Sequence, residues 1–280
     1  MRQILNLLAG MTAGNPDALV CDWSSLRYQH IIAICSRLQE SDYKPATINK
    51  ASAAIRGVLL ASWQGGQMTT EANQKAVSVK GVKSETLPTG RELTSGELSA
   101  LMQACESDPS IVGIRDAAII GLMYAAGMRR DEVTTLDLAN YDPVTCCLVN
   151  KGKGNKERTA YLNNGTAEVL ADWITNRGNQ SGALFLPINK SGKLKNRYIS
   201  PQAVYNMLCE RAELAGISHF SPHDLRRSFV GDLLDAGAVI VTDAKMAGHA
   251  SVTTTAHYGR RPEDAMRKTA GLLNVPYHKA

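Results

Sequence analysis

The feature that most constrains the fold is one short hairpin pattern in a chain that otherwise favours helices. Strand-like runs at 146–150 and 158–162 flank a loop rich in glycine and lysine. Elsewhere apolar residues recur at helical spacing, and we expect helices at 24–40, 46–64, 95–107, 111–126, 165–177, 201–215, 222–236, 240–247, 251–258 and 262–273. The sequence therefore predicts a mainly α fold with one small antiparallel β-sheet.

A stretch at 79–92 divides the chain into two parts. Gly81, Pro88 and Gly90 interrupt the helical pattern there. With 280 residues, the chain is long enough for two domains. We expect a helical domain at 1–85, an interdomain linker at 86–92 and a second, mostly helical domain at 93–280.

Charge and cysteine usage narrow the class of protein. The formal net charge is +5, which permits nucleic-acid binding without requiring it. The six cysteines form no CxxC pair, so we expect neither a disulfide nor a metal framework, and reduced thiols suit a cytoplasmic protein. No apolar run approaches the ~20 residues of a membrane span. The N-terminus also lacks the pattern of a secretion signal.

Two of four polar patterns lie in the middle of the chain, and each also has an ordinary structural explanation. Arg129 follows Gly127, and a glycine suits the end of the preceding helix, so the arginine is displayed at a helix junction. In isolation it is most simply a surface charge. The loop 151–157 could place a lysine in a DNA groove, or it could be a flexible, solvated turn.

The other two patterns lie toward the C-terminus. Ser221 and Pro222 suit a helix start, and His223 and Arg226 share one face of that helix because they are three residues apart. Tyr258 ends the last pattern, which begins at the helix-ending Gly-His pair 248–249. Incidental polar residues and a half-buried packing tyrosine are the ordinary explanations.

The order and spacing of all four patterns resemble the tyrosine recombinase, or phage integrase, family, which includes the Xer recombinases. The family signature reads G-[LM]-R-x-x-E, G-K-G-x-K-x-R, H-x-x-R and L-G-H-x-S-x-x-T-T-x-x-Y, and all four parts occur in order between 127 and 258. Ala247 stands where the family has leucine, a mild departure. The resemblance covers roughly 95–275. Less specifically, 1–85 resembles a short version of the family's helical core-binding (SAM-like) domain, without an arm-binding domain before it.

The resemblance implies a role for each matching residue. Arg129 and Arg226 would clamp the scissile phosphate, and paired guanidiniums suit the charge that builds there in the transition state. Tyr258 would be the nucleophile, which needs help to lose its proton because an unperturbed phenol has a pKa near ~10. Lys153 would protonate the departing 5′ oxygen.

The remaining family residues would assist this reaction. His223 would act as an acid–base partner, His249 would hydrogen-bond a non-bridging oxygen, and Glu132 would support the surroundings of the first arginine. A phosphotyrosine conserves the bond energy for rejoining, so the resemblance implies no cofactor. A metal pair of His219 and His223 lacks a third ligand, so we expect no metal site.

Double-stranded DNA is the expected partner, held between the two domains as in a clamp. The basic residues predicted to contact it are Lys44, Lys50, Arg56, Lys80, Lys83, Arg91, Lys151, Lys156, Arg158 and Arg227. Those near the helix 46–64 would equally suit a solvated face. The family implies a homotetramer on two recombination sites. The helix 262–273 would either pack on its own domain or dock on a neighbouring protomer.

The biological role predicted from the resemblance is that of an integrase or excisionase of a mobile element, or of a Xer-like resolvase. It would work through a 3′-phosphotyrosine intermediate and a Holliday junction, in the cytoplasm and associated with the nucleoid. Two other functions stay open. A topoisomerase IB-like relaxing enzyme would use the same chemistry without pairing two sites. A non-catalytic DNA-binding protein of the same fold would have no need of Tyr258.

Overall fold

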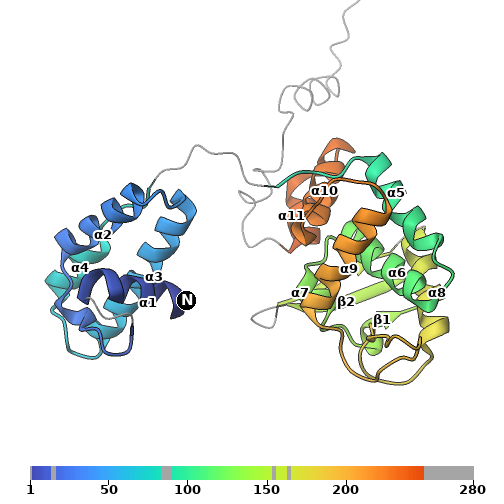
Figure 1. Cartoon of the computed structure of the whole chain (residues 1–280), viewed down its shortest axis with the longest axis horizontal. Coiled ribbons are helices and arrows are strands. Elements are labelled where there is room, and N and C mark those ends of the chain that lie inside the picture. Colours follow the sequence, from blue (N-terminus) through green and yellow to red (C-terminus); the bar gives the residue numbers. More distant parts are fainter. Residues whose placement is uncertain (1, 14–16, 83–89, 153–155, 163–164, 249–280) are drawn as a thin grey trace, which may run out of the picture. The chain divides into compact units, whose positions relative to one another are not determined.

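Helices dominate the structure, a computed structural model that describes residues 2–13, 17–82, 90–152, 156–162 and 165–248 (Figure 1). The mainly α fold with a small antiparallel sheet is confirmed. The chain divides into two compact units, Met1–Leu87 and Pro88–Ala280. In the part that is described, no helix is long and apolar enough to cross a membrane.

The first unit is a set of helices around its own apolar core. Its elements are α1 (Arg2–Ala13), the 3-10 helix η1 (Trp23–Ser25), α2 (Tyr28–Glu40), α3 (Pro45–Gln64) and α4 (Thr70–Val77). Helix α3 packs against all the others, because Ile48, Ile55 and Leu59 form a fully buried stripe along it. The apolar pattern predicts α2 and α3, whereas α1 and α4 are not among the expected helices.

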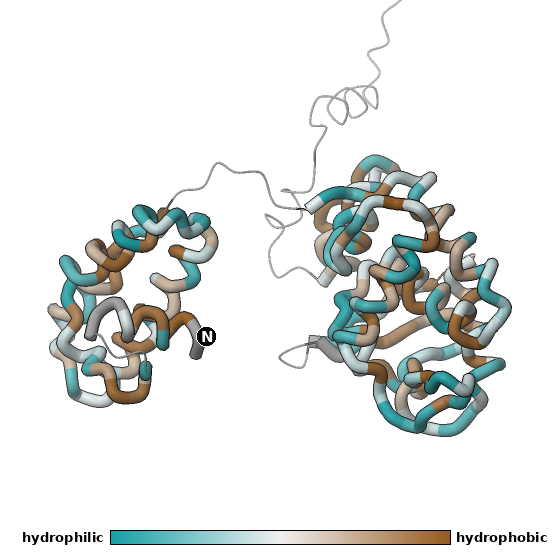
Figure 2. Tube along the Cα trace, in the orientation of Figure 1, coloured by the Kyte–Doolittle hydropathy of each residue, from teal (hydrophilic) through white to brown (hydrophobic). Residues whose placement is uncertain are grey.

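The second unit is built around α6 (Ile111–Ala125). Every residue from 117 to 123 is buried, and a helix that is apolar on all sides belongs in the centre of a domain. Around it or beside its neighbours lie α5 (Ser95–Glu106), α7 (Arg130–Val133), α8 (Gly165–Arg177), α9 (Pro201–Leu214), α10 (Pro222–Asp235) and α11 (Ile240–Ala247). Figure 2 shows apolar stretches within each unit that alternate with hydrophilic ones.

One three-stranded antiparallel sheet completes the second unit, in the order β1-β2-β3. Its strands are β1 (Tyr141–Asp142), β2 (Cys147–Gly152) and β3 (Lys156–Tyr161). The hairpin β2–β3 agrees with the sequence pattern, although its ladder runs on to the pair Gly152 and Lys156. The two-residue β1 is too short to be seen in the pattern.

A largely buried ion network joins α6, α9 and the segment between α5 and α6. Asp116, 2% exposed, accepts hydrogen bonds from Arg115 Nη2 at 2.7 Å and Arg211 Nε at 2.9 Å. Arg211 Nη2 also donates to Asp108 Oδ2 at 2.6 Å. Burial raises the pKa of the Asp116 carboxyl, although both arginines oppose the shift. The charge on Asp116 therefore depends on keeping its cationic partners.

We expect Arg211→Met to lower the free energy of unfolding by about 3–5 kcal/mol, because it leaves buried carboxylates short of a cation. The exposed Arg197 offers a matched control, and Arg197→Met should change stability by less than ~0.5 kcal/mol. Urea denaturation of both variants measures the difference. Equal stabilities would show that the network contributes little.

Candidate active site

Arg129 lies where the chain turns from α6 into α7. Gly127, two residues earlier, has φ +55°. A Cβ atom there would lie 2.4 Å from Cδ1 of Phe229, so both the backbone angle and the space require glycine. The backbone N–H of Arg129 donates to Glu132 Oε2 at 2.9 Å, and its Nη1 donates to Glu132 Oε1 at 2.6 Å. The arginine is thus fixed at its base while its side chain stays 48% exposed.

His223 and Arg226 lie on the first turns of α10. Ser221 and Asp224 form a reciprocal cap at the start of this helix, and Pro222 occupies its first turn. Arg226 is 1% exposed. Its Nη1 donates to the carbonyl oxygen of Gly127 at 2.5 Å, and its Nη2 donates to the carbonyl oxygen of Ala247. The guanidinium therefore bridges the ends of α6 and α11.

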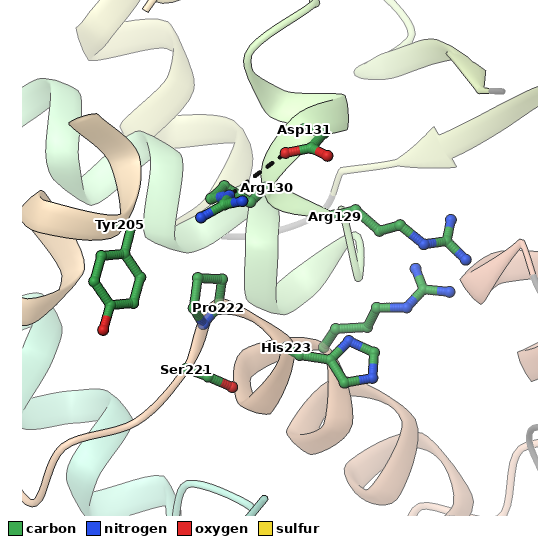
Figure 3. Close-up of a pocket in the computed structure, with 8 residues that line it drawn as sticks. Arg129, Arg130, Asp131, Tyr205, Ser221, Pro222 and His223 are labelled. Atoms are coloured by element: carbon green, nitrogen blue, oxygen red, sulfur yellow. Dashed lines mark hydrogen bonds and ion pairs between the residues drawn. The ribbon is translucent and has the colours of Figure 1, made fainter. Parts of the chain in front are cut away.

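These three side chains line one open pocket of about 340 Å³ (Figure 3). Arg129 comes from the α6–α7 junction, and His223 and Arg226 come from α10. The other lining residues are Arg130, Asp131, Tyr205, Ser221 and Pro222. Two guanidiniums and an imidazole at one pocket provide several N–H donors for the oxygens of a phosphate.

His223 has a lowered pKa. Partial burial of a residue that stays exposed overall is the largest cause, and the charges of Arg226 and Arg227 add to it, with a smaller contribution from Arg129, while Asp224 opposes the shift. The imidazole is therefore neutral at neutral pH. A neutral imidazole can accept a proton or donate its single N–H, so it is suited to an acid–base role beside the arginines.

The Phage integrase family matches residues 91–264, which is more than half of the chain. The chain belongs to the phage integrase family. It is a Xer-like tyrosine recombinase, an enzyme that cleaves and rejoins DNA strands.

Individual relatives agree with this assignment. The recombinase is 29% identical to tyrosine recombinase XerC of Proteus mirabilis over 269 residues, which are 92% of this chain and 80% of XerC. It is 30% identical to XerC of Natranaerobius thermophilus over 247 residues, which are 84% of this chain and 79% of that XerC.

Among solved structures, the Tn1549 transposon integrase in complex with transposon right end DNA has a TM-score of 0.72. Its identity is 16%, and the match covers 96% of this chain and 90% of the integrase. XerH bound to difH has a TM-score of 0.63 at 21% identity and covers 88% of this chain and 70% of XerH. Both show that the recombinase shares their fold.

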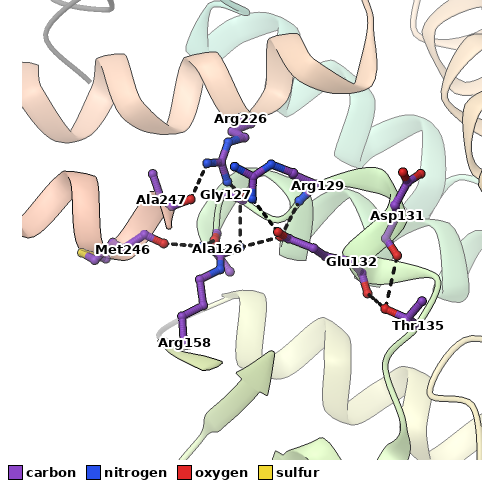
Figure 4. Close-up of polar contacts among 10 residues, drawn as sticks. All are labelled: Ala126, Gly127, Arg129, Asp131, Glu132, Thr135, Arg158, Arg226, Met246 and Ala247. Atoms are coloured by element: carbon purple, nitrogen blue, oxygen red, sulfur yellow. Dashed lines mark hydrogen bonds and ion pairs between the residues drawn. The ribbon is translucent and has the colours of Figure 1, made fainter. Parts of the chain in front are cut away.

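Glu132, predicted as a supporting residue, contacts two arginines of the recombinase (Figure 4). Besides Arg129, it accepts a hydrogen bond from Arg158 Nη2 at 2.8 Å. Burial raises the pKa of its carboxyl, but the Arg129 backbone N–H and the charge of Arg158 outweigh burial, so the pKa is lowered. Glu132 is therefore an anion throughout the neutral range.

Several predicted residues lie outside the described part of the recombinase. These are Lys83, Lys153, His249 and Tyr258, as well as the predicted helices 251–258 and 262–273. Most of the predicted linker 86–92 lies outside it too. Lys151 and Lys156 occupy paired strands, but their side chains are not described.

The predicted DNA-contacting residues that are described fall into three groups: exposed lysines, half-buried arginines and two largely buried arginines. Lys44, Lys50 and Lys80 are exposed and could each reach a phosphate. Arg56 and Arg91 are half-buried and serve contacts within their own units. Arg56 Nη2 donates to the Val79 carbonyl at 2.8 Å, and Arg91 ion-pairs with Glu97 at 2.7 Å.

DNA contact by Arg158 and Arg227 stays a prediction, and in the described structure both side chains are largely buried. Arg227 is 4% exposed, with its Nε 3.9 Å from Asp224 Oδ1. The Arg158 side chain is 13% exposed, and its guanidinium points into the protein. The sequence pattern marks both as basic, but it cannot show which carbonyls and carboxylates surround them. Tyr205 is the converse case, because nothing in the sequence of α9 marks it as a pocket residue.

The lowered pKa of His223 predicts a pH-dependent stability. Between that pKa and the ordinary value of 6.5, the unfolded chain binds more protons at this histidine than the folded protein does. Stability at this site therefore rises with pH across that window and is lost on acidification. We expect acidification from about pH 7.5 to about pH 5 to lower the free energy of unfolding less in His223→Gln than in the unchanged protein. Urea denaturation at both pH values tests this, and an equal loss in both proteins would contradict it.

Proposed function

We propose that this enzyme is a site-specific recombinase that cleaves DNA through a 3′-phosphotyrosine on Tyr258. The observation that carries the proposal is the single pocket shared by Arg129, His223 and Arg226. A scissile phosphate in this pocket would meet both guanidiniums, which would bind its non-bridging oxygens. Such preorganised donors stabilise the charge that develops as the phosphorus is attacked.

The reaction is a pair of transesterifications. The phenol oxygen of Tyr258 forms a bond to phosphorus while the bond from phosphorus to the 5′ oxygen breaks, and Lys153 gives that oxygen a proton. A 5′ hydroxyl then attacks the phosphotyrosine and releases the phenol, so no net oxidation or hydrolysis occurs. His223, as the acid–base partner, would take the phenol proton during cleavage and return it during rejoining, and His249 would hydrogen-bond a non-bridging oxygen of the phosphate. The chemistry requires no ATP, because the phosphotyrosine conserves the bond energy for rejoining. It requires no metal, because the arginines supply the positive charge.

The chain's two parts would divide the task of holding DNA. We assign residues 1–85 to core binding, 86–92 to the linker and 93–280 to catalysis. The exposed Lys44, Lys50 and Lys80 would contact phosphates. Binding should weaken steeply as salt is added, because each neutralised phosphate releases condensed counterions.

Two pairs of protomers would bring two DNA sites together and exchange strands through a Holliday junction. The helix 262–273 would dock on a neighbouring protomer and so couple cleavage to assembly. The XerC relatives favour a resolvase role, while the fold shared with a transposon integrase is compatible with integration or excision. The pairing of two DNA sites distinguishes the proposed recombinase from a relaxing enzyme of the topoisomerase IB kind.

The proposal is tested with sites chosen by the protein itself. DNA bound by the Tyr258→Phe variant is selected from the genomic DNA of the source organism, and one or two copies of the selected site are cloned into plasmids. We expect the unchanged enzyme to yield deletion or inversion products only from the two-copy plasmid. Efficient relaxation of both plasmids without recombinants, or no selected site at all, would overturn the proposal.

A further inference from the structure

Arg158 on β3 contacts two segments of the catalytic unit besides its own strand (Figure 4). Its Nη1 donates to the carbonyl oxygens of Ala126, at 3.2 Å, and Met246. Its Nη2 donates to Glu132 Oε2 at 2.8 Å and to the Gly127 carbonyl oxygen at 3.4 Å. One largely buried guanidinium thus joins β3, the α6–α7 junction and the end of α11.

The same two helix ends also hold Arg226. Arg226 donates to the carbonyl oxygen of Gly127, which Arg158 also binds, and to that of Ala247, the residue after Met246. Carbonyls at the C-terminal ends of helices carry partial negative charge, so they attract cations. Arg158 and Arg226 therefore form two parallel links between the ends of α6 and α11. Only Arg226 is also part of the pocket lining.

Arg158 is also linked to Arg129 indirectly, through Glu132. Glu132 lies between the two arginines, 2.6 Å from Nη1 of Arg129 and 2.8 Å from Nη2 of Arg158. Loss of Arg158 would leave Glu132 with Arg129 as its one ion-pair partner in the described part of the chain. The carboxylate would then be free to shift, and the base of Arg129 would shift with it.

We propose that Arg158 is a positioning residue that holds Arg129 and Arg226 in the geometry that binds the scissile phosphate. The inference rests on the proposed function, in which those two arginines bind that phosphate. It replaces the expectation of DNA contact for Arg158, because both Nη atoms donate to protein acceptors and Arg158, unlike Arg226, does not line the pocket. Packing agrees, since a Cβ atom on Gly248 would lie 3.1 Å from Cδ of Arg158.

A positioning role and a DNA-contacting role for Arg158 predict different effects of a substitution. Arg158→Lys keeps the charge but loses the planar fork that reaches several acceptors at once. We expect single-turnover cleavage of a nicked suicide substrate at saturating enzyme to fall by about 10–100-fold, because small misplacements of catalytic groups are costly. The affinity for DNA and its salt dependence should stay at the level of the unchanged enzyme.

Lys50→Ala is the matched control, because Lys50 is exposed and assigned only to a phosphate contact. Its expected effect is the opposite one, a weaker affinity for DNA and a salt slope smaller by about one. A smaller salt slope in Arg158→Lys, with its saturated cleavage rate intact, would show that Arg158 contacts DNA and would overturn the inference.

The Glu132→Gln variant removes the charge of the other partner in the Glu132–Arg158 ion pair and keeps Arg158. If the two residues act through one another, the double variant should cleave no more slowly than the slower single variant. Effects on the rate that multiply, or that merely follow a lowered thermal midpoint, would reduce Arg158 to a structural residue. Should Arg158→Lys fail to fold, normal cleavage by Glu132→Gln would still overturn the inference. Absence of any adduct in the unchanged enzyme would instead refute the proposed function.

Discussion

The Tyr258→Phe variant should form no covalent adduct with DNA, whereas the Tyr205→Phe variant should form as much as the unchanged enzyme. Removal of the phenol oxygen removes the nucleophile and leaves the rest of the side chain in place, so DNA binding should be retained. The loss should be complete within the sensitivity of a denaturing gel run on a nicked suicide substrate. This is the largest effect that we expect from any single substitution.

Tyr205 is the informative control because it lines the same pocket as the two arginines. Its phenol oxygen lies 3.3 Å from Nε2 of His219, and hydrogen bonding with the thiol of Cys209 raises the pKa of the phenol. A phenol that is harder to ionise is a poorer nucleophile. An adduct that survives in Tyr258→Phe and disappears in Tyr205→Phe would reverse the assignment.

Replacement of Arg129 or Arg226 by lysine should lower the cleavage rate by about 10²–10³-fold, because each guanidinium supplies preorganised donors to the phosphate. Only Arg226→Lys should also lower stability. Arg226 is 1% exposed and satisfies two buried carbonyls, and a lysine cannot satisfy both in the same geometry. We expect its free energy of unfolding to fall by about 1–3 kcal/mol.

Arg129 provides the contrast, since its side chain is 48% exposed. Arg129→Lys should leave stability nearly unchanged while it slows cleavage. Single-turnover rates and thermal midpoints, measured on both variants at one salt concentration, separate the two effects. Cleavage within about threefold of the unchanged enzyme in both variants would mean that the pocket does not bind the scissile phosphate.

Much of the fold follows from local sequence signals. The observed bounds of α8 and α11 coincide with the expected 165–177 and 240–247, and those of α9 and α10 differ by one residue. Capping serines at 200 and 221, each followed by a proline, mark the starts of α9 and α10. The two-residue β1 is too short to leave such a signal, whereas α1 and α4 are missed even though Ile4, Leu5 and Leu8 recur in α1 at helical spacing.

Only part of the site could be predicted from the sequence. The spacing of His223 and Arg226 fixes their common helix face, but it does not bring Arg129 to them. The three side chains come together because α10 packs against α6. From the sequence, only the family resemblance predicts that they share a site. Burial of Arg158 and Arg227 is likewise a tertiary property, because an arginine that binds carbonyls looks the same in sequence as one that binds DNA.

The most direct test of the account is an experimental structure of the covalent adduct on a suicide substrate. We predict a phosphate bonded to Tyr258, with nitrogens of both Arg129 and Arg226 within about 3 Å of its oxygens. A phosphate joined to another residue, or one that lies outside the pocket of these arginines, would contradict the account.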